Sequence, residues 1–130
     1  MISSVVHIGC GAGFSGDRID AAIPVVATLA KKEGPKYLIF ETLAERTLAL
    51  AQKHRRKDPS HGYSPFLESY IRPILKKCHE SGIKIVSNFG AANPKGGAIK
   101  IAEIAKETGC KDFKIAIVEG DDLLQIMSGA

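Results

Sequence analysis

The sequence has no tryptophan, few aromatic residues and no long apolar run. Its 130 residues include 3 cysteines, and Phe, Trp and Tyr together make up 6%. Three widely spaced cysteines form neither a disulfide framework nor a CxxC metal knuckle, and their odd number favours reduced thiols in a cytoplasm. No run approaches the ~20 apolar residues of a membrane span, and no secretory signal opens the chain. We expect a soluble, cytoplasmic protein without a membrane partner.

Charge of neither sign dominates. Lys+Arg 18 against Asp+Glu 14 gives a net charge of +4, and the basic residues are spread along the chain. A nucleic-acid-binding protein usually gathers its positive charge on one face. The densest basic run, at residues 53–57, closes an expected helix, where cations in solvent complement the helix macrodipole. We therefore expect no nucleic-acid partner.

Four short β-branched runs alternate with four segments of helical periodicity. Strands and helices alternating at this spacing favour βαβ crossovers and a parallel sheet. Residues 1–130 are therefore expected to form a single α/β domain, with a parallel sheet of about four strands, helices on both faces and Rossmann-like βαβ topology. The expected strands are 5–8, 37–40, 83–86 and 114–118, and the expected helices are 18–32, 42–56, 66–80 and 96–108.

Glycines mark the ends of three expected helices. Gly34, Gly82 and Gly109 each follow a helical segment and precede a strand. This is the C-cap position, where the backbone takes a positive φ that glycine adopts without strain.

Polar residues and glycines follow all four expected strands. The carboxyl ends of parallel strands meet at one edge of a sheet, which is where open α/β sheets bind ligands. The loop of residues 58–65 is long enough, at ~3.3 Å per residue, to return to that edge; a surface turn stiffened by two prolines is the alternative. The candidate catalytic residues are Glu41, Glu119, Asn88 and Asn93, and the candidate substrate-binding residues are Gly11, Gly13, Gly16, Asp17, Arg18, Glu45, Arg46, His61 and Tyr63.

The first loop contains a glycine pattern, Gly11-x-Gly13-x-x-Gly16, between a strand and a helix. This context indicates dinucleotide binding, so an NAD(P)-binding domain is one hypothesis. Against it, Glu41 lies farther along the chain than a ribose-binding acid should, and Asp17 would bring a carboxylate to the pyrophosphate position. Asp17 is instead expected to act as a helix N-cap.

An acidic group follows the fourth expected strand. Asp121 and Asp122 could bind a divalent cation through their carboxylate oxygens, or Asp121 could cap a following helix. The cofactor stays open, and a divalent cation is the candidate that these two carboxylates suggest.

Taken in order, these loops resemble the acyclic terpene utilisation (AtuA-like) family. The resemblance runs from His7 to near Leu124 and implies that the chain corresponds to the N-terminal portion of longer members, as one part of a larger protein or complex. The segments that carry it are GAGFSGDR, YLIFETLAERTLAL, DPSHGY, GIKIVSNFGAANP and IVEGDDLL.

The resemblance implies a link to the breakdown of branched acyclic terpenoids, such as citronellol-type compounds handled as acyl-CoA esters. We expect an enzyme or enzyme subunit that acts on a branched acyl-CoA or small carboxylate by hydratase, lyase or isomerase chemistry. A non-catalytic subunit that completes a larger partner is the alternative. In the enzyme hypothesis, Glu41 or Glu119 transfers a proton with a pKa raised by partial burial, Arg18 or Arg46 holds the negative group, and Asn88 and Asn93 donate to an oxyanion.

The C-terminal segment is expected to contact a partner. An uncovered edge strand exposes unpaired backbone groups, and the tail after residues 115–118 is too short to cover one. We therefore expect a homo-oligomer or a complex with a second subunit, formed through the fourth strand and the apolar residues that follow it.

Overall fold

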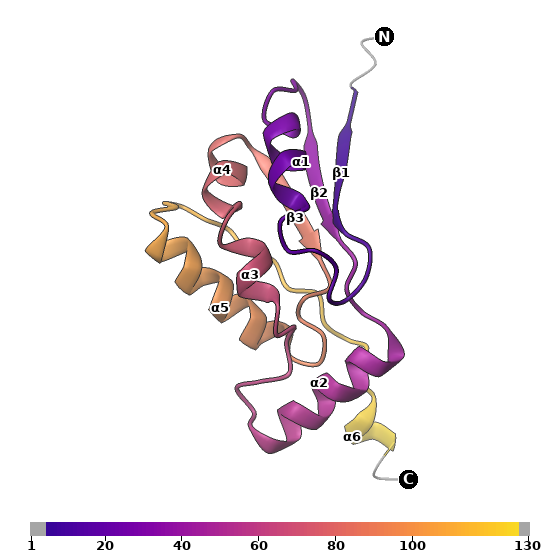
Figure 1. Ribbon diagram of the computed structural model, residues 1–130. Coiled ribbons are helices and arrows are strands. Elements are labelled where there is room, and N and C mark those ends of the chain that lie inside the picture. Colours follow the sequence, from indigo (N-terminus) through magenta and orange to yellow (C-terminus); the bar gives the residue numbers. More distant parts are fainter. Residues whose placement is uncertain (1–4, 128–130) are drawn as a thin grey trace.

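The computed structural model describes residues 5–127 (Figure 1). Its centre is a three-stranded parallel sheet in the order β1-β2-β3. Each strand pairs with its neighbour in the sequence, so that Gly9 lies beside Leu38 and Leu38 beside Ile85. The strands are β1 (His7–Ala12), β2 (Lys36–Phe40) and β3 (Ile83–Ser87).

The helices follow the expected segments, but one segment is divided, the ends of the others shift by up to four residues, and a further short helix lies at residues 124–127. Residues 66–80 form two helices instead of one, because Pro73 lacks the backbone N–H that would continue the hydrogen-bonding ladder. The first helix begins at Ala22 instead of residue 18. The helices are α1 (Ala22–Leu29), α2 (Glu45–Lys57), α3 (Leu67–Ile71), α4 (Leu75–Glu80), α5 (Pro94–Glu107) and α6 (Leu124–Met127).

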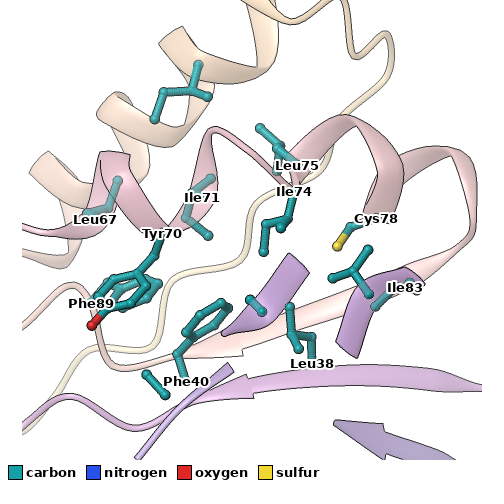
Figure 2. Close-up of a cluster of buried hydrophobic side chains, with 14 of the residues drawn as sticks. Leu38, Phe40, Leu67, Tyr70, Ile71, Ile74, Leu75, Cys78, Ile83 and Phe89 are labelled. Carbon is teal, nitrogen blue, oxygen red and sulfur yellow. The ribbon is translucent and has the colours of Figure 1, made fainter. Parts of the chain in front are cut away.

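The core lies between the sheet and helices α1, α3 and α4. Leu38 and Phe40 of β2 point into it and are almost completely buried (Figure 2). The ring of Phe40 lies 5.6 Å from that of Tyr70 on α3 and 5.0 Å from that of Phe89, measured between centroids. Burial also raises the pKa of the Cys78 thiol to about 12, so this cysteine is protonated and part of the apolar packing at neutral pH.

The opposite face of the sheet carries none of these helices, which corrects the expectation of helices on both faces. Residues whose side chains alternate away from the core remain accessible: Ile8 is 69% exposed and Val86 51%. Cys10 of β1 is exposed as well. The strand order explains the result. Because successive right-handed crossovers move in one direction across the sheet, they place their helices on the same side. Covering both faces requires a reversal of direction, which the order β1-β2-β3 lacks.

The fourth expected strand, at residues 114–118, is not part of the sheet. These residues are extended and exposed, and among residues 5–127 no backbone hydrogen bond joins them to β3. Val118 is 90% exposed. The structure therefore has three paired strands where the sequence predicts four. β-Branched composition favours an extended conformation, but pairing also needs alignment with a neighbouring edge.

The three glycines that follow helices have the predicted conformation. Gly34, Gly82 and Gly109 have φ values of 90°, 65° and 75°, in the left-handed region. Gly82 and Gly109 directly follow the C-caps of α4 and α5 and so mark the ends of these helices, whereas α1 ends at its C-cap Ala30, four residues before Gly34. Within residues 5–127, none of the helices combines the length and apolar character that crossing a membrane would require.

Candidate functional site

Three loops meet where the strands end. Because β1, β2 and β3 are parallel, Gly13, Glu41 and Asn88 all lie at the C-terminal edge of the sheet. Glu119, which was expected there through a fourth strand, instead follows the unpaired segment 114–118. The predicted edge is therefore correct for Gly13, Glu41 and Asn88. The expectation that a fourth paired strand leads to Glu119 is wrong.

Asn88 connects the ends of β2 and β3. Its Oδ1 accepts hydrogen bonds from the backbone N–H of Thr42 at 2.9 Å and from the Thr42 hydroxyl at 3.3 Å, and its Nδ2 donates to Glu41 Oε1 at 2.8 Å. Thr42 is 4% exposed, so its N–H would have no access to solvent without this partner. The Asn88 carboxamide therefore fixes the position of Glu41 as well as joining two loops.

Glu41 is exposed and ionised. Its Oε1 also accepts a hydrogen bond from the backbone N–H of Leu43 at 2.9 Å. The Leu43 N–H, and after it the Asn88 amide, hold the pKa of Glu41 below its ordinary value, because both donors stabilise the carboxylate. The expectation that burial raises this pKa is wrong, since the side chain lies at the surface. Glu41 is therefore ionised at neutral pH and can accept hydrogen bonds, and it is not a protonated acid.

The glycine loop is folded onto itself. Gly11 packs against the Phe40 ring so tightly that a Cβ there would lie 2.4 Å from the nearest ring carbon. Asp17 Oδ2 accepts the Gly13 N–H at 3.1 Å, and the buried Tyr70 hydroxyl donates to the Asp17 carbonyl at 2.7 Å. Gly16 has a φ of 86°, which the turn requires. Gly11 and Gly16 thus shape the loop, whereas Gly13 faces open space.

This loop lacks the dinucleotide-binding arrangement. In that arrangement the glycine turn leads directly into a helix whose N-terminal N–H groups hold the pyrophosphate. Here α1 begins at Ala22, after a further turn, and Ala21 precedes it as N-cap. Asp17 is not a helix cap, and it takes the Gly13 N–H that a phosphate would use. The geometry disfavours the NAD(P) hypothesis.

Three charged candidates stand apart from the Glu41–Asn88 pair. Arg18 donates from Nε and Nη2 to the two carboxylate oxygens of Asp20, each at 2.8 Å, so its fork is already occupied. This pair raises the pKa of Arg18 and lowers that of Asp20. Glu45 and Arg46 are exposed in the first turn of α2. Among residues 5–127, neither Arg18 nor Arg46 lines either of the two grooves described below, and Glu41 does not line them either.

The loop of residues 58–65 does return to the C-terminal edge. Asn93 Nδ2 donates to the carbonyl groups of Pro59 and His61 at 3.0 and 2.9 Å. The route differs from the expected one, because α2 lies beyond the ends of the strands instead of running back along the sheet (Figure 1). His61 is exposed with Nδ1 3.0 Å from Asp58 Oδ2, and Tyr63 is half-buried against the core.

Asn93 is occupied as a structural residue. Besides the two bonds to the 58–65 loop, its Oδ1 accepts the Gly96 N–H at 2.9 Å and so caps α5. Both amide protons and the carbonyl oxygen of the side chain thus have partners within the protein. An oxyanion would have to displace one of these, so Asn93 supports the site by holding two loops together.

A groove of about 660 Å³ lies between α2, the start of α5 and the segment 119–123, and we call it the polar groove because five of its lining residues are charged. Two ion pairs cross it: Lys95 Nζ lies 3.3 Å from Glu119 Oε2, and Arg55 Nη1 lies 3.0 Å from Asp122 Oδ2. Asp121 also lines the groove. Within residues 5–127, no group of three His, Cys, Asp or Glu side chains could hold a metal ion. Within these residues, the fold therefore brings no third metal ligand to Asp121 and Asp122.

An apolar groove of about 850 Å³ adjoins the polar one. It runs along β3 between helices α3, α4 and α5 and the extended segment 112–118. Asn88 and Leu43 line it, and Ala91, Pro94 and Asp121 line both grooves. The groove therefore passes the carboxamide that holds Glu41.

Sequence reasoning missed Arg55 and Lys95 as groove residues and Thr42 and Tyr70 as supports. Residue 55 belongs to the basic run that was assigned to solvent. A signal was present, because Leu48, Gln52 and Arg55 are spaced by four and three residues and so share one face of α2. Nothing local marks Tyr70, whose partner is 53 residues away.

The fold and the edge define a class: a parallel α/β protein with a fixed carboxylate at the strand ends and a groove that is apolar along one part and charged along another. Comparison with known families identifies the family. Residues 6–130 match the family described as "Acyclic terpene utilisation family protein AtuA", and the chain belongs to it. No curated protein and no solved structure matches the chain.

Proposed function

We propose that this chain takes part in acyclic terpene utilisation by binding a branched acyl-CoA or small carboxylate at the C-terminal edge of its sheet. One observation carries this: Asn88 lines the apolar groove, and its carboxamide donates to the Glu41 carboxylate. A branched hydrocarbon chain suits an apolar groove, where burial contributes roughly 25 cal/mol per Å². The match to the acyclic terpene utilisation family supports the proposal that the substrate carries a branched hydrocarbon chain.

The chemistry assigned to this site is that of a hydratase, lyase or isomerase, with Glu41 as the proton acceptor. Its lowered pKa keeps it ionised in the neutral range, as a base must be before it takes a proton. A substrate that covers Glu41 would exclude water and raise that pKa toward the working pH. Asn88 acts by holding Glu41 in place and not as an independent oxyanion donor.

The test compares Glu41→Gln with Glu33→Gln in the intact chain. Both substitutions turn an exposed carboxylate into an amide of similar size, and only Glu41 is held by Asn88. Turnover of a branched acyl-CoA should fall by at least about 100-fold in the first variant, which is typical for losing a general base, and stay unchanged in the second. Equal activity in wild type and Glu41→Gln would remove Glu41 from the mechanism.

Groove occupancy is tested separately by filling the apolar groove. Ala98 lines it, whereas Ala102, one turn further along α5, is exposed and lies outside it. Ala98→Leu should abolish the rise in melting temperature that a branched acyclic carboxylate causes, and Ala102→Leu should preserve it. NAD(P), ATP and divalent cations form the comparison panel. Stabilisation by NAD(P) alone would favour the nucleotide hypothesis, and no stabilisation by any compound would favour a non-catalytic subunit.

We also propose a homo-oligomer or a complex with a second subunit in the cytoplasm, formed through residues 115–118 and the C-terminal segment. Ile117, Val118, Leu123, Ile126 and Met127 are between 41% and 90% exposed. Apolar side chains gathered on one surface segment are typical of interaction surfaces.

A further inference from the structure

The charges of the polar groove come from two different kinds of structure. Its cations are held by regular elements: Arg55 lies on the 13-residue helix α2, and Lys95 lies in the first turn of α5. Its three carboxylates, Glu119, Asp121 and Asp122, all come from one exposed segment without regular structure. We name residues 119–122 the acidic strap.

The contacts of the acidic strap with the two cations are weak. Lys95 and Glu119 keep 72% and 48% of their side-chain surface exposed, and Arg55 and Asp122 keep 42% and 45%. Exposed ion pairs contribute little because water screens both charges and the long side chains lose entropy. Gly120 has a φ of 129°, so the strap turns at a residue of high conformational freedom. A competing anion can therefore take these cations at small cost.

Arg55 retains capacity for such an anion. Among residues 5–127 its hydrogen bonds go to the Ala92 carbonyl at 2.6 Å and to Asp122 at 3.0 Å, and both use Nη1. The bond to Ala92 fixes the guanidinium against the loop after β3, independently of the strap. Nε and Nη2 can therefore donate to the oxygens of a phosphate in the planar fork that arginine provides.

We propose that Arg55 and Lys95 form a phosphate-binding subsite, and that the acidic strap occupies it as an internal competitor until a ligand displaces it. Among residues 5–127, the strap supplies every carboxylate that lines the groove. When the strap leaves, the charged residues of the lining change from three carboxylates and two cations to the two cations. The movement that opens the subsite therefore also makes it attractive to a dianion. The inference deepens the proposed function by assigning the phosphates of a carrier such as coenzyme A to this groove.

If the acidic strap competes with phosphate, two kinds of substitution should change the affinity for phosphate in opposite directions. Removing the competitor, in Glu119→Gln/Asp122→Asn, should tighten phosphate binding. The expected gain is about 2-fold to 30-fold, the range that two exposed ion pairs of ~0.2–1 kcal/mol each correspond to. Removing a cation, in Lys95→Gln, should weaken binding by about 10-fold or more, the fold-change of one charge-assisted hydrogen bond. Lys95 is the safer cation to change because the Arg55 side chain also supports the Ala92 carbonyl.

The measurement is calorimetric titration of the full chain with inorganic phosphate, coenzyme A, acetate and adenosine at constant ionic strength. Arg56→Gln is the matched control, since Arg56 is exposed on the same helix and does not line the groove. Phosphate and coenzyme A should bind, adenosine should not, and acetate should bind more weakly. An unchanged affinity in the double carboxylate variant, an Arg56→Gln defect as large as that of Lys95→Gln, or no binding of phosphate by any variant would overturn the proposal.

The same data separate this inference from the proposed function. If a branched carboxylate stabilises the wild type and not Ala98→Leu while phosphate fails to bind, the proposed function stands and the phosphate subsite is rejected. If phosphate binds with the predicted dependence on the strap while no branched acyl compound binds, the subsite stands and the proposed substrate is rejected.

Discussion

Replacing Asn88 by alanine tests the polar connection between β2 and β3. The substitution removes the partner of the Thr42 backbone N–H, which is 2.9 Å from Asn88 Oδ1, and of the Thr42 hydroxyl. Thr42 is 4% exposed, so the N–H is left buried without a hydrogen bond. Such a group costs about 1–3 kcal/mol. That is a large part of the roughly 5–15 kcal/mol that stabilises a typical domain.

The assay is urea unfolding followed by circular dichroism. Asn88→Ala should lower the urea midpoint while leaving the slope unchanged, because the surface exposed on unfolding is the same. Thr42→Val is the matched control. It keeps the β-branched shape and the 2.9 Å bond from the backbone N–H, and loses only the hydroxyl contact at 3.3 Å. Its destabilisation should stay below about 1 kcal/mol, since one net hydrogen bond of ordinary strength is at stake.

A second readout follows Glu41 itself. In Asn88→Ala the pKa of Glu41 should rise toward its ordinary value, because one of the two donors that stabilise its carboxylate is gone. It should not reach that value, since the Leu43 N–H remains in place. NMR titration of the carboxyl carbon measures this directly. A urea midpoint equal to that of the wild type, or an unchanged Glu41 pKa, would refute the role assigned to Asn88.

Three further predictions follow. Gly11→Ala should destabilise the fold by about 1–3 kcal/mol through overpacking, because the new Cβ would lie 2.4 Å from the Phe40 ring, whereas Gly13→Ala should change the urea midpoint little, with no atom within 4 Å. The contribution of Glu41 to stability should be complete above its unfolded pKa near ~4.3 and lost as pH falls through its lower folded pKa, so wild type and Glu41→Gln should converge in urea midpoint in strong acid. If the proposed assembly forms through residues 115–118, Val118→Asp, at a side chain that is 90% exposed, should dissociate it without unfolding the chain; light scattering that shows a monomeric wild type would contradict the proposed interface.

Much of the local structure follows from the sequence alone. The 3.6-residue pattern located the helical segments, and the positive φ values of Gly82 and Gly109 mark the ends of two of them. The strand-end position of Glu41 and Asn88 was predictable too, because parallel strands must deliver their ends to one edge. These features depend on neighbouring residues and on backbone geometry, which short stretches of sequence specify.

The tertiary structure decided which candidates meet and which are already occupied. Asn88 reaches Thr42 across 46 residues and Arg55 reaches Asp122 across 67. Partners at such separations are set by how loops pack after the sheet forms, and no periodicity encodes them. The same holds for Arg18. Its charge suggested that it binds a substrate, but its guanidinium already donates to both carboxylate oxygens of Asp20.

The tertiary structure also decided how the sheet is covered. The sequence of residues 114–118 specifies an extended, apolar segment, and the structure leaves it unpaired beside β3, where it forms a wall of the apolar groove. Likewise, alternating side chains specify that β1 to β3 have two faces, but the direction of successive crossovers determines that helices pack on only one. Local propensity determines the conformation of a segment, whereas its neighbours in space determine whether that segment is paired, covered or left to form a binding surface.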